Sequence, residues 1–277
     1  MVVDGCQPAM RSQVDNWLTQ AWRLFFPPTC ALCGAGAERL DICAGCEADL
    51  PRFERACPRC ATPLAGHVAE GIECGRCQQR PPAYDRALCA FAYRFPADRL
   101  LQALKFHGAL VYGRVLGELL AAHIETAGDP LPSLIVPMPL HSSRLRERGF
   151  NQAFEIARPI ARRFALPLET RRVTRVRATR EQTHLDPPAR RANLRGAFAA
   201  HAGAWRSHVA IVDDVLTTGS TAGELARTLR RAGVSRVDVW CVARTVARVA
   251  GGRARQTHSR QVADRAADAS LSLRATR

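Results

Sequence analysis

Apolar residues form two kinds of run along the chain, continuous and periodic. Continuous runs, which predict short strands buried on both faces of a sheet, cover residues 87–95, 134–136, 209–212 and 234–244. Apolar residues at helical spacing cover 100–120 with a break near Gly108, a stretch ending near Phe164, and 221–232. Strands that alternate with helices predict an α/β fold built on a doubly wound parallel sheet.

The segment 209–221 joins an apolar strand to a helix through an acidic pair and a loop. Two adjacent carboxylates, Asp213 and Asp214, end the strand. The small polar residues of the loop are Thr217, Thr218, Gly219, Ser220 and Thr221. Backbone N–H groups at a helix N-terminus bind phosphate, and paired carboxylates can accept hydrogen bonds from the vicinal hydroxyls of a sugar. The alternative is an ordinary strand-to-helix turn with two solvated carboxylates.

The ends of the following helix are predicted by its capping residues. Thr221 with Glu224 three residues later fits a capping box, which predicts that the helix begins there. Gly233 stands where a helix ends.

A basic stretch follows the strand at 134–136. Arg144, Arg146 and Arg148 lie between that strand and the helix ending near Phe164, and we expect them on a loop. In an open α/β sheet the ligand binds at the carboxyl ends of the strands, so such a loop could hold a pyrophosphate. The alternative is a solvated basic loop. Lys105, on the helical run 100–120, is either a solvated residue or a phosphate contact.

The cysteines predict two metal sites near the N-terminus. Eight of the 11 cysteines form four CxxC pairs: Cys30/Cys33, Cys43/Cys46, Cys57/Cys60 and Cys74/Cys77. Two CxxC turns complete one tetrahedral four-thiolate site, so the simplest arrangement is two local sites, with crossed pairing as the alternative. Zinc suits such sites best and iron is the other candidate. Because a closed site has no open coordination position, both sites are expected to be structural.

Composition and charge limit the classes of protein that the chain can represent. A length of 277 residues with 47% hydrophobic residues fits a globular protein of one or two domains. The formal net charge of +15 favours polyanionic partners without choosing among them. No stretch approaches the ~20 apolar residues that span a bilayer, and no secretory signal is evident. With paired thiols, this predicts a cytoplasmic protein.

The remaining segments complete the expected domain organisation. Residues 1–28 are expected to contain a short helix, 29–80 a double zinc-ribbon module, and 84–248 the sheet domain. Residues 170–198 are dense in arginine and contain Pro187 and Pro188. Residues 249–277, rich in Arg, Ala and Ser, predict a disordered basic tail.

The segment 209–221 resembles the signature of the type I phosphoribosyltransferases: an apolar strand, two acidic residues, an apolar pair and a Thr/Gly/Ser loop. The resemblance implies that the loop holds the 5′-phosphate of phosphoribosyl pyrophosphate (PRPP). It also implies that Asp213 and Asp214 hold the ribose hydroxyls as catalytic residues, with Mg²⁺ bridging the pyrophosphate. In that family the loop after the strand corresponding to 134–136 binds pyrophosphate, and a mobile hood occupies the place of 170–198.

The whole chain, from about residue 25 to 245, resembles the ComF family. The matching positions are the four CxxC pairs, Leu104-Lys105-Phe106, Val136-Pro-Met-Pro-Leu140, Arg148-Gly-Phe-Asn-Gln152, Gln182 with Arg191 and Asn193, and Val212 to Thr221. This resemblance implies a role in DNA uptake during natural transformation and contact with the competence machinery. Three functions remain open: a phosphoribosyltransferase, which is a glycosyltransferase; an accessory protein that binds single-stranded DNA; and a PRPP-sensing regulator.

Overall fold

The computed structural model describes residues 28–38, 40–66, 69–107, 110–177, 194–201 and 203–246. The expected N-terminal helix, the basic tail, and most of the Arg-rich stretch, with Gln182, Arg191 and Asn193, lie outside these residues. The described residues divide into two compact units, the first ending at Asp49 and the second beginning at Leu50. The boundary after Asp49 therefore falls between the second and third CxxC pairs, inside the segment 29–80.

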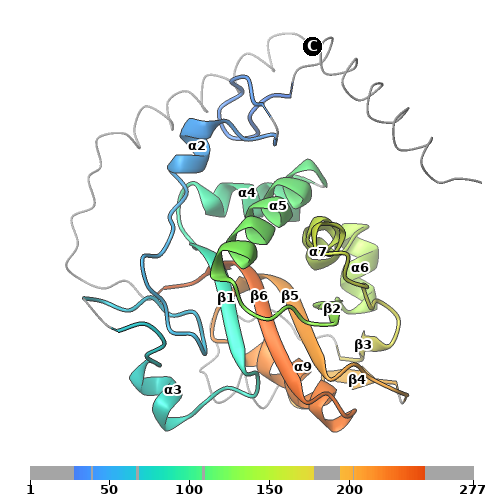
Figure 1. Ribbon diagram of the computed structural model, residues 1–277. Helices are drawn as coiled ribbons and strands as arrows, with labels where there is room; N and C mark the ends of the chain where they lie inside the picture. The colour runs from blue at the N-terminus through green and yellow to red at the C-terminus, as the bar shows by residue number, and fades with distance from the viewer. Residues whose placement is uncertain are drawn as a thin grey trace, which may run out of the picture. The chain divides into compact units, whose positions relative to one another are not determined.

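A parallel sheet forms the centre of the second unit. Its strands are β1 (Arg86–Ala92), β2 (Leu134–Pro137), β5 (His208–Leu216) and β6 (Arg236–Arg244). They lie in the order β1-β6-β5-β2, from left to right in Figure 1, and every neighbouring pair is parallel. The predicted parallel α/β sheet is thus confirmed. β2 ends at Pro137, opposite Val212, and β5 continues past this point to Leu216 at the same edge of the sheet.

Helices cover both faces of this sheet. On one face, Leu225 and Leu229 of α9 (Ser220–Arg231) join a buried cluster with Val209 and Val237. The other face contacts α5 (Leu110–Ala127) and α7 (Gln152–Arg163). These two helices approach closely because Gly117 has no side chain: a Cβ atom there would lie 2.4 Å from the Ile156 carbonyl oxygen. The sheet is therefore doubly wound, as predicted.

The periodic run at 100–120 forms two helices, α4 (Ala97–His107) and α5. The strand at 209–212 is longer than predicted, because β5 continues through the acidic pair to Leu216. Two short strands were not predicted: β3 (Val173–Arg175) and β4 (Phe198–Ala200) pair antiparallel, with Arg175 opposite Phe198. This pairing brings the two ends of the 176–197 segment side by side.

The basic stretch after β2 is a helix, so the predicted loop was wrong. His141 is the N-cap of the helix α6 (Ser142–Arg148), and its ring accepts a hydrogen bond from the Ser143 N–H. Gly149, with a φ of 78°, is the C-cap. Asn151 then caps α7 and also donates from Nδ2 to the Met138 carbonyl (3.1 Å). None of the described helices is long and apolar enough to cross a bilayer.

Candidate metal centres and phosphate-binding edge

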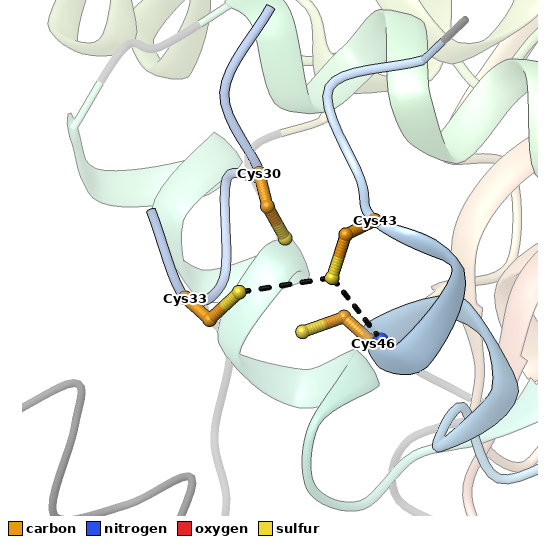
Figure 2. A group of neighbouring side chains, drawn as sticks. All are labelled: Cys30, Cys33, Cys43 and Cys46. Carbon is orange, nitrogen blue, oxygen red and sulfur yellow. Dashed lines mark hydrogen bonds between the residues drawn. The ribbon is translucent and has the colours of Figure 1, made fainter. Parts of the chain in front are cut away.

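The first unit gathers four cysteines around one point. Figure 2 shows the side chains of Cys30, Cys33, Cys43 and Cys46 turned toward one another. The Cys33 and Cys43 sulfurs are 3.7 Å apart, and the Cys46 N–H donates to the Cys43 sulfur. Cys43 is also the N-cap of the short helix α2 (Ala44–Ala48). The CxxC turn and the helix start thus present two sulfurs each.

The second unit repeats this arrangement. Cys57, Cys60, Cys74 and Cys77 gather in the same way, with Cys74 at the N-cap of α3 (Gly75–Gln79) and its sulfur 3.6 Å from that of Cys60. The pairing of CxxC motifs is therefore local in both groups, not crossed.

The two CxxC turns share one hydrogen-bond pattern. In the first, Cys30 N–H donates to the Ala35 carbonyl and Gly34 N–H donates to the Cys30 carbonyl. In the second, Cys57 N–H donates to the Thr62 carbonyl and Ala61 N–H donates to the Cys57 carbonyl. Gly34 and Ala61 both have a positive φ, 74° and 54°. The chain therefore contains the same metal-binding turn twice, which the cysteine spacing alone did not reveal.

The sulfur positions fit a tetrahedral zinc ion. All sulfurs of a group lie within 4.8 Å of one another. Zinc–sulfur bonds of about 2.3 Å in a tetrahedron place the sulfurs about 3.8 Å apart, close to the 3.7 and 3.6 Å separations. Against the effect of burial, hydrogen bonds from Thr62 and the neighbouring cysteines lower the pKa of the Cys60 thiol to about 6, whereas burial raises the pKa of Cys57 and Cys77. The two Cys₄ groups are zinc-binding sites.

The acidic pair lies at the carboxyl edge of the sheet, against α4. Lys105, the only lysine of the chain, has its Nζ 2.7 Å from Asp214 Oδ2, and both side chains are largely enclosed. Burial lowers the pKa of Lys105, but the charge and hydrogen bond of Asp214 raise it above its usual value. Burial and the charge of Asp214 raise the pKa of Asp213 well above its usual value. The ammonium group therefore offsets part of the charge of two adjacent carboxylates.

The loop from 217 to 221 combines exposure with a tightly defined backbone. Thr217 and Thr218 are exposed, and Gly219 is the N-cap of α9 with a φ of 76°. A Cβ atom at Gly219 would lie 2.6 Å from the Tyr84 hydroxyl oxygen, so glycine meets both a conformational and a steric requirement. The loop thus leads into a 12-residue helix whose first N–H groups lack intrahelical acceptors.

The capping box predicted at Thr221 was wrong. With Gly219 at the N-cap, Glu224 lies beyond the N3 position that a capping box needs. The buried Glu224 carboxylate instead accepts hydrogen bonds from the Gly196 N–H (2.8 Å) and from Arg227. Glu224 therefore links α9 to the turn before β4.

The three arginines of α6 do not share one environment. Arg146 is exposed, whereas Arg144 and Arg148 are half-buried. Arg148 donates to Oε1 of the buried Gln152 at 2.7 Å, across the turn between α6 and α7.

Arg244, which the sequence analysis did not single out, is buried at the end of β6, opposite Leu216. Its Nη1 donates to the carbonyls of Leu216 (2.7 Å) and Thr217, where the loop begins. The sequence did contain a signal for Arg244: it is a charged residue at the carboxyl end of an apolar strand, and ligands of open α/β sheets bind at that edge.

Comparison with known proteins agrees with this arrangement. Residues 21–90 match the family model of the double zinc ribbon domain. The chain is 37% identical over 229 residues to the DNA utilization protein YhgH of Salmonella typhi and 36% identical to that of Escherichia coli, in each case covering 80% of this chain and all of the relative. It is 33% identical over 210 residues to Competence protein F of Haemophilus influenzae, covering 73% of this chain and 90% of that protein. The chain belongs to the ComF family. The family resemblance predicted from the sequence is confirmed, as is the double zinc ribbon.

Proposed function

We propose that this protein binds PRPP at the carboxyl edge of its parallel sheet and transfers the phosphoribosyl group to a nucleophilic acceptor. One observation carries the proposal: an acidic pair, half-buried Asp213 and buried Asp214, stands two residues before a loop with exposed threonines and a glycine N-cap at the start of α9. Paired carboxylates suit vicinal hydroxyls, and a helix N-terminus suits a phosphate. A type I phosphoribosyltransferase fold is part of this proposal.

Each group of the site has a separate task in the proposed reaction. Asp213 and Asp214 accept hydrogen bonds from the ribose 2′- and 3′-hydroxyls, and the 217–221 loop holds the 5′-phosphate. Lys105 reduces the repulsion between the acidic pair and an anionic substrate. Arg144, Arg146 and Arg148 are the proposed pyrophosphate contacts. The acceptor forms its bond to C1′ while the C1′–oxygen bond breaks, and pyrophosphate leaves with the electron pair.

Magnesium is part of the proposal as a partner of PRPP. When bound, Mg²⁺ would neutralise charge on the leaving pyrophosphate. Carboxylate oxygens of the acidic pair are suitable hard ligands, although Asp214 already pairs with Lys105.

Calorimetry with PRPP and Mg²⁺ tests this site. Replacing both Asp213 and Asp214 by Asn preserves size but removes both charges, so PRPP binding should weaken by about 2–4 kcal/mol, because charge-assisted hydrogen bonds contribute ~1.5–3 kcal/mol each. Glu70→Gln, at an exposed carboxylate, is the matched control. Equal affinity in the double variant and the wild type would reject the site.

Single-stranded DNA binding is a second candidate, favoured by the net charge of +15 and by the printed names of the relatives, which refer to DNA utilization and competence. Under this proposal the protein works in the cytoplasm with DNA taken up by the competence machinery. The proposed contacts are the arginines of the 170–198 stretch and of the 249–277 tail.

Gel shifts at about 0.15 M salt, near physiological ionic strength, test DNA binding. Affinity should fall steeply with salt, since each neutralised phosphate releases counterions. Deleting 249–277 should weaken binding evenly across sequences, whereas replacing Arg144, Arg146 and Arg148 should weaken PRPP binding instead. Competition between PRPP and the strand would place both at one site. Absence of any shift at micromolar protein would reject the DNA-binding candidate.

A further inference from the structure

The side chain of Arg244 joins two parts of the second unit that are far apart in the sequence. On one side its Nη1 donates to the carbonyls of Leu216 and Thr217, at the start of the candidate phosphate loop. On the other side its Nε donates to the carbonyl of Cys60 (3.0 Å) and its Nη2 to Oγ1 of Thr62 (3.1 Å). A single planar guanidinium thus spans the loop and the second metal-binding turn.

The contact with Thr62 leads directly to a metal ligand. Thr62 Oγ1 lies 3.1 Å from the Cys60 sulfur. A metal-bound thiolate can only accept a hydrogen bond, and Arg244 can only donate one. The Thr62 hydroxyl must therefore accept from Arg244 and donate to Cys60 when the metal is bound. Protonated or displaced Cys60 would no longer fix the direction of this hydroxyl.

A second contact joins the same parts of the structure. Tyr84, which is 1% exposed, places its hydroxyl against Gly219 of the loop. The carbonyl of the same residue accepts from Arg59 Nη1 (3.4 Å), which lies inside the Cys57/Cys60 turn. The Ala87 N–H on β1 also donates to the Pro58 carbonyl (3.0 Å). The second metal-binding turn is therefore hydrogen-bonded to the start of β1 and to the residue Tyr84 that contacts the loop.

The first metal-binding turn lacks the residue that makes this connection. Ala35 occupies the position that is equivalent to Thr62, because both carbonyls accept the N–H of the first cysteine of their turn. Alanine has no hydroxyl, and Cys30 and its partners belong to the other compact unit. The two sites are alike as metal sites but differ in what their turns can contact.

We propose that Arg244 is a positioning residue that couples the conformation of the 217–221 loop to metal binding at Cys57, Cys60, Cys74 and Cys77, through the hydroxyl of Thr62. The inference rests on the proposed function in so far as this loop holds the 5′-phosphate. Metal binding at the second site then sets the affinity for the phosphate, whereas the first site does not.

Hydrogen exchange of the full-length protein, without PRPP, tests the coupling itself. Thr62→Val keeps all eight metal-binding cysteines and the shape of the side chain but removes the hydroxyl. We expect it to retain two zinc ions and to exchange the amides of 217–221 at least tenfold faster than the wild type. Thr62→Ser should restore slow exchange. Thr126→Val, at an exposed hydroxyl on α5, is the matched control.

Affinity measurements test whether the coupling reaches the ligand. Thr62→Val should weaken PRPP binding about tenfold, equivalent to about 1.4 kcal/mol. In an Arg244→Met background the same substitution should change the affinity less than twofold, since the connection is already broken. Cys74→Ser should accelerate loop exchange and Cys43→Ser should not.

Two results would overturn the inference: loop exchange in zinc-loaded Thr62→Val equal to that of the wild type, or equal penalties of Thr62→Val with and without Arg244. If the wild type fails to bind PRPP, the proposed function is wrong, and the exchange measurements still decide whether the loop and the metal site are coupled.

Discussion

Lys105 Nζ lies 2.7 Å from Asp214 Oδ2, and the two residues are separated by more than one hundred positions in the chain. This ion pair holds α4 against the carboxyl end of β5. It gives the chain's only lysine a specific partner at the candidate substrate site, in place of the solvated position or phosphate contact considered from the sequence.

Replacing Lys105 by Met should destabilise the protein, because two adjacent carboxylates then lack a compensating cation. Breaking a buried pair costs about 3–5 kcal/mol, and the partial exposure of Lys105 reduces the expected loss to about 1–3 kcal/mol. Adding Asp214→Asn should restore most of the free energy of unfolding, measured with urea. Arg163→Met, which breaks more exposed pairs with Glu118 and Glu125, should cost less than about 1 kcal/mol. Equal losses in the two single variants would contradict this account.

Replacing Asp213 by Asn should stabilise the protein at pH 8 while it weakens PRPP binding. The pKa of Asp213 is raised by burial and by Asp214, so the folded state holds its proton more tightly than the unfolded state does. The free energy of unfolding therefore falls as the pH rises from about 4 toward the folded pKa. Asn does not titrate, so the variant avoids this loss of stability at high pH. Its thermal midpoint should therefore exceed that of the wild type at pH 8, and the difference should vanish near pH 4. A pH-independent difference would show that titration is not the cause.

Replacing Gly219 by Ala should destabilise the protein by about 2–3 kcal/mol and weaken PRPP binding. The positive φ alone costs about 1–2 kcal/mol, and the new Cβ would meet the Tyr84 hydroxyl at 2.6 Å. Gly128→Ala separates the two effects, since Gly128 has a φ of 65° and nothing within 4 Å. Adding Tyr84→Phe to Gly219→Ala should recover only the part of the stability loss that comes from the clash with the Tyr84 hydroxyl. Equal unfolding midpoints for the two alanine variants would remove the role assigned to Tyr84.

Elemental analysis of the purified protein should find two zinc ions per chain. Cys43→Ser and Cys74→Ser should each lower the content to one, because a four-thiolate site loses most of its affinity with one ligand. Cys43→Ser should leave the unfolding midpoint of the Leu50–Gly252 unit unchanged, whereas Cys74→Ser should lower it. The reason is that Cys74 belongs to this unit and Cys43 does not. Iron in place of zinc, or eight freely titratable thiols, would reject the assignment.

The sheet could be predicted from the sequence because its strands are continuous apolar runs. Val209 to Val212 is buried on both faces, so the run itself reports the strand. The break near Gly108 correctly separated two helices. The eight paired cysteines identified both metal sites, since thiolate spacing reflects local geometry.

Other features depended on contacts that no local pattern reports. A charged run such as 142–148 has no apolar face, so its helix was missed although His141 and Gly149 cap it. Lys105, Arg244 and Glu224 each have a partner on a distant segment, and these contacts follow only from the packing of strands and helices. The predicted capping box failed because Gly219, not Thr221, adopts the capping position.

The repeated metal-binding turn has a consequence for how the sequence can vary. Two copies of one turn stand in the same chain, but Thr62 of the second copy has a hydroxyl that contacts Arg244, whereas Ala35, at the equivalent position of the first copy, has none. Position 35 should accept any residue that preserves the turn, so it should drift freely among relatives. Position 62 should remain Ser or Thr wherever position 244 is Arg, and the two should change together. The two copies of the turn would then differ in role: one would only bind its metal, and the other would also position the 217–221 loop.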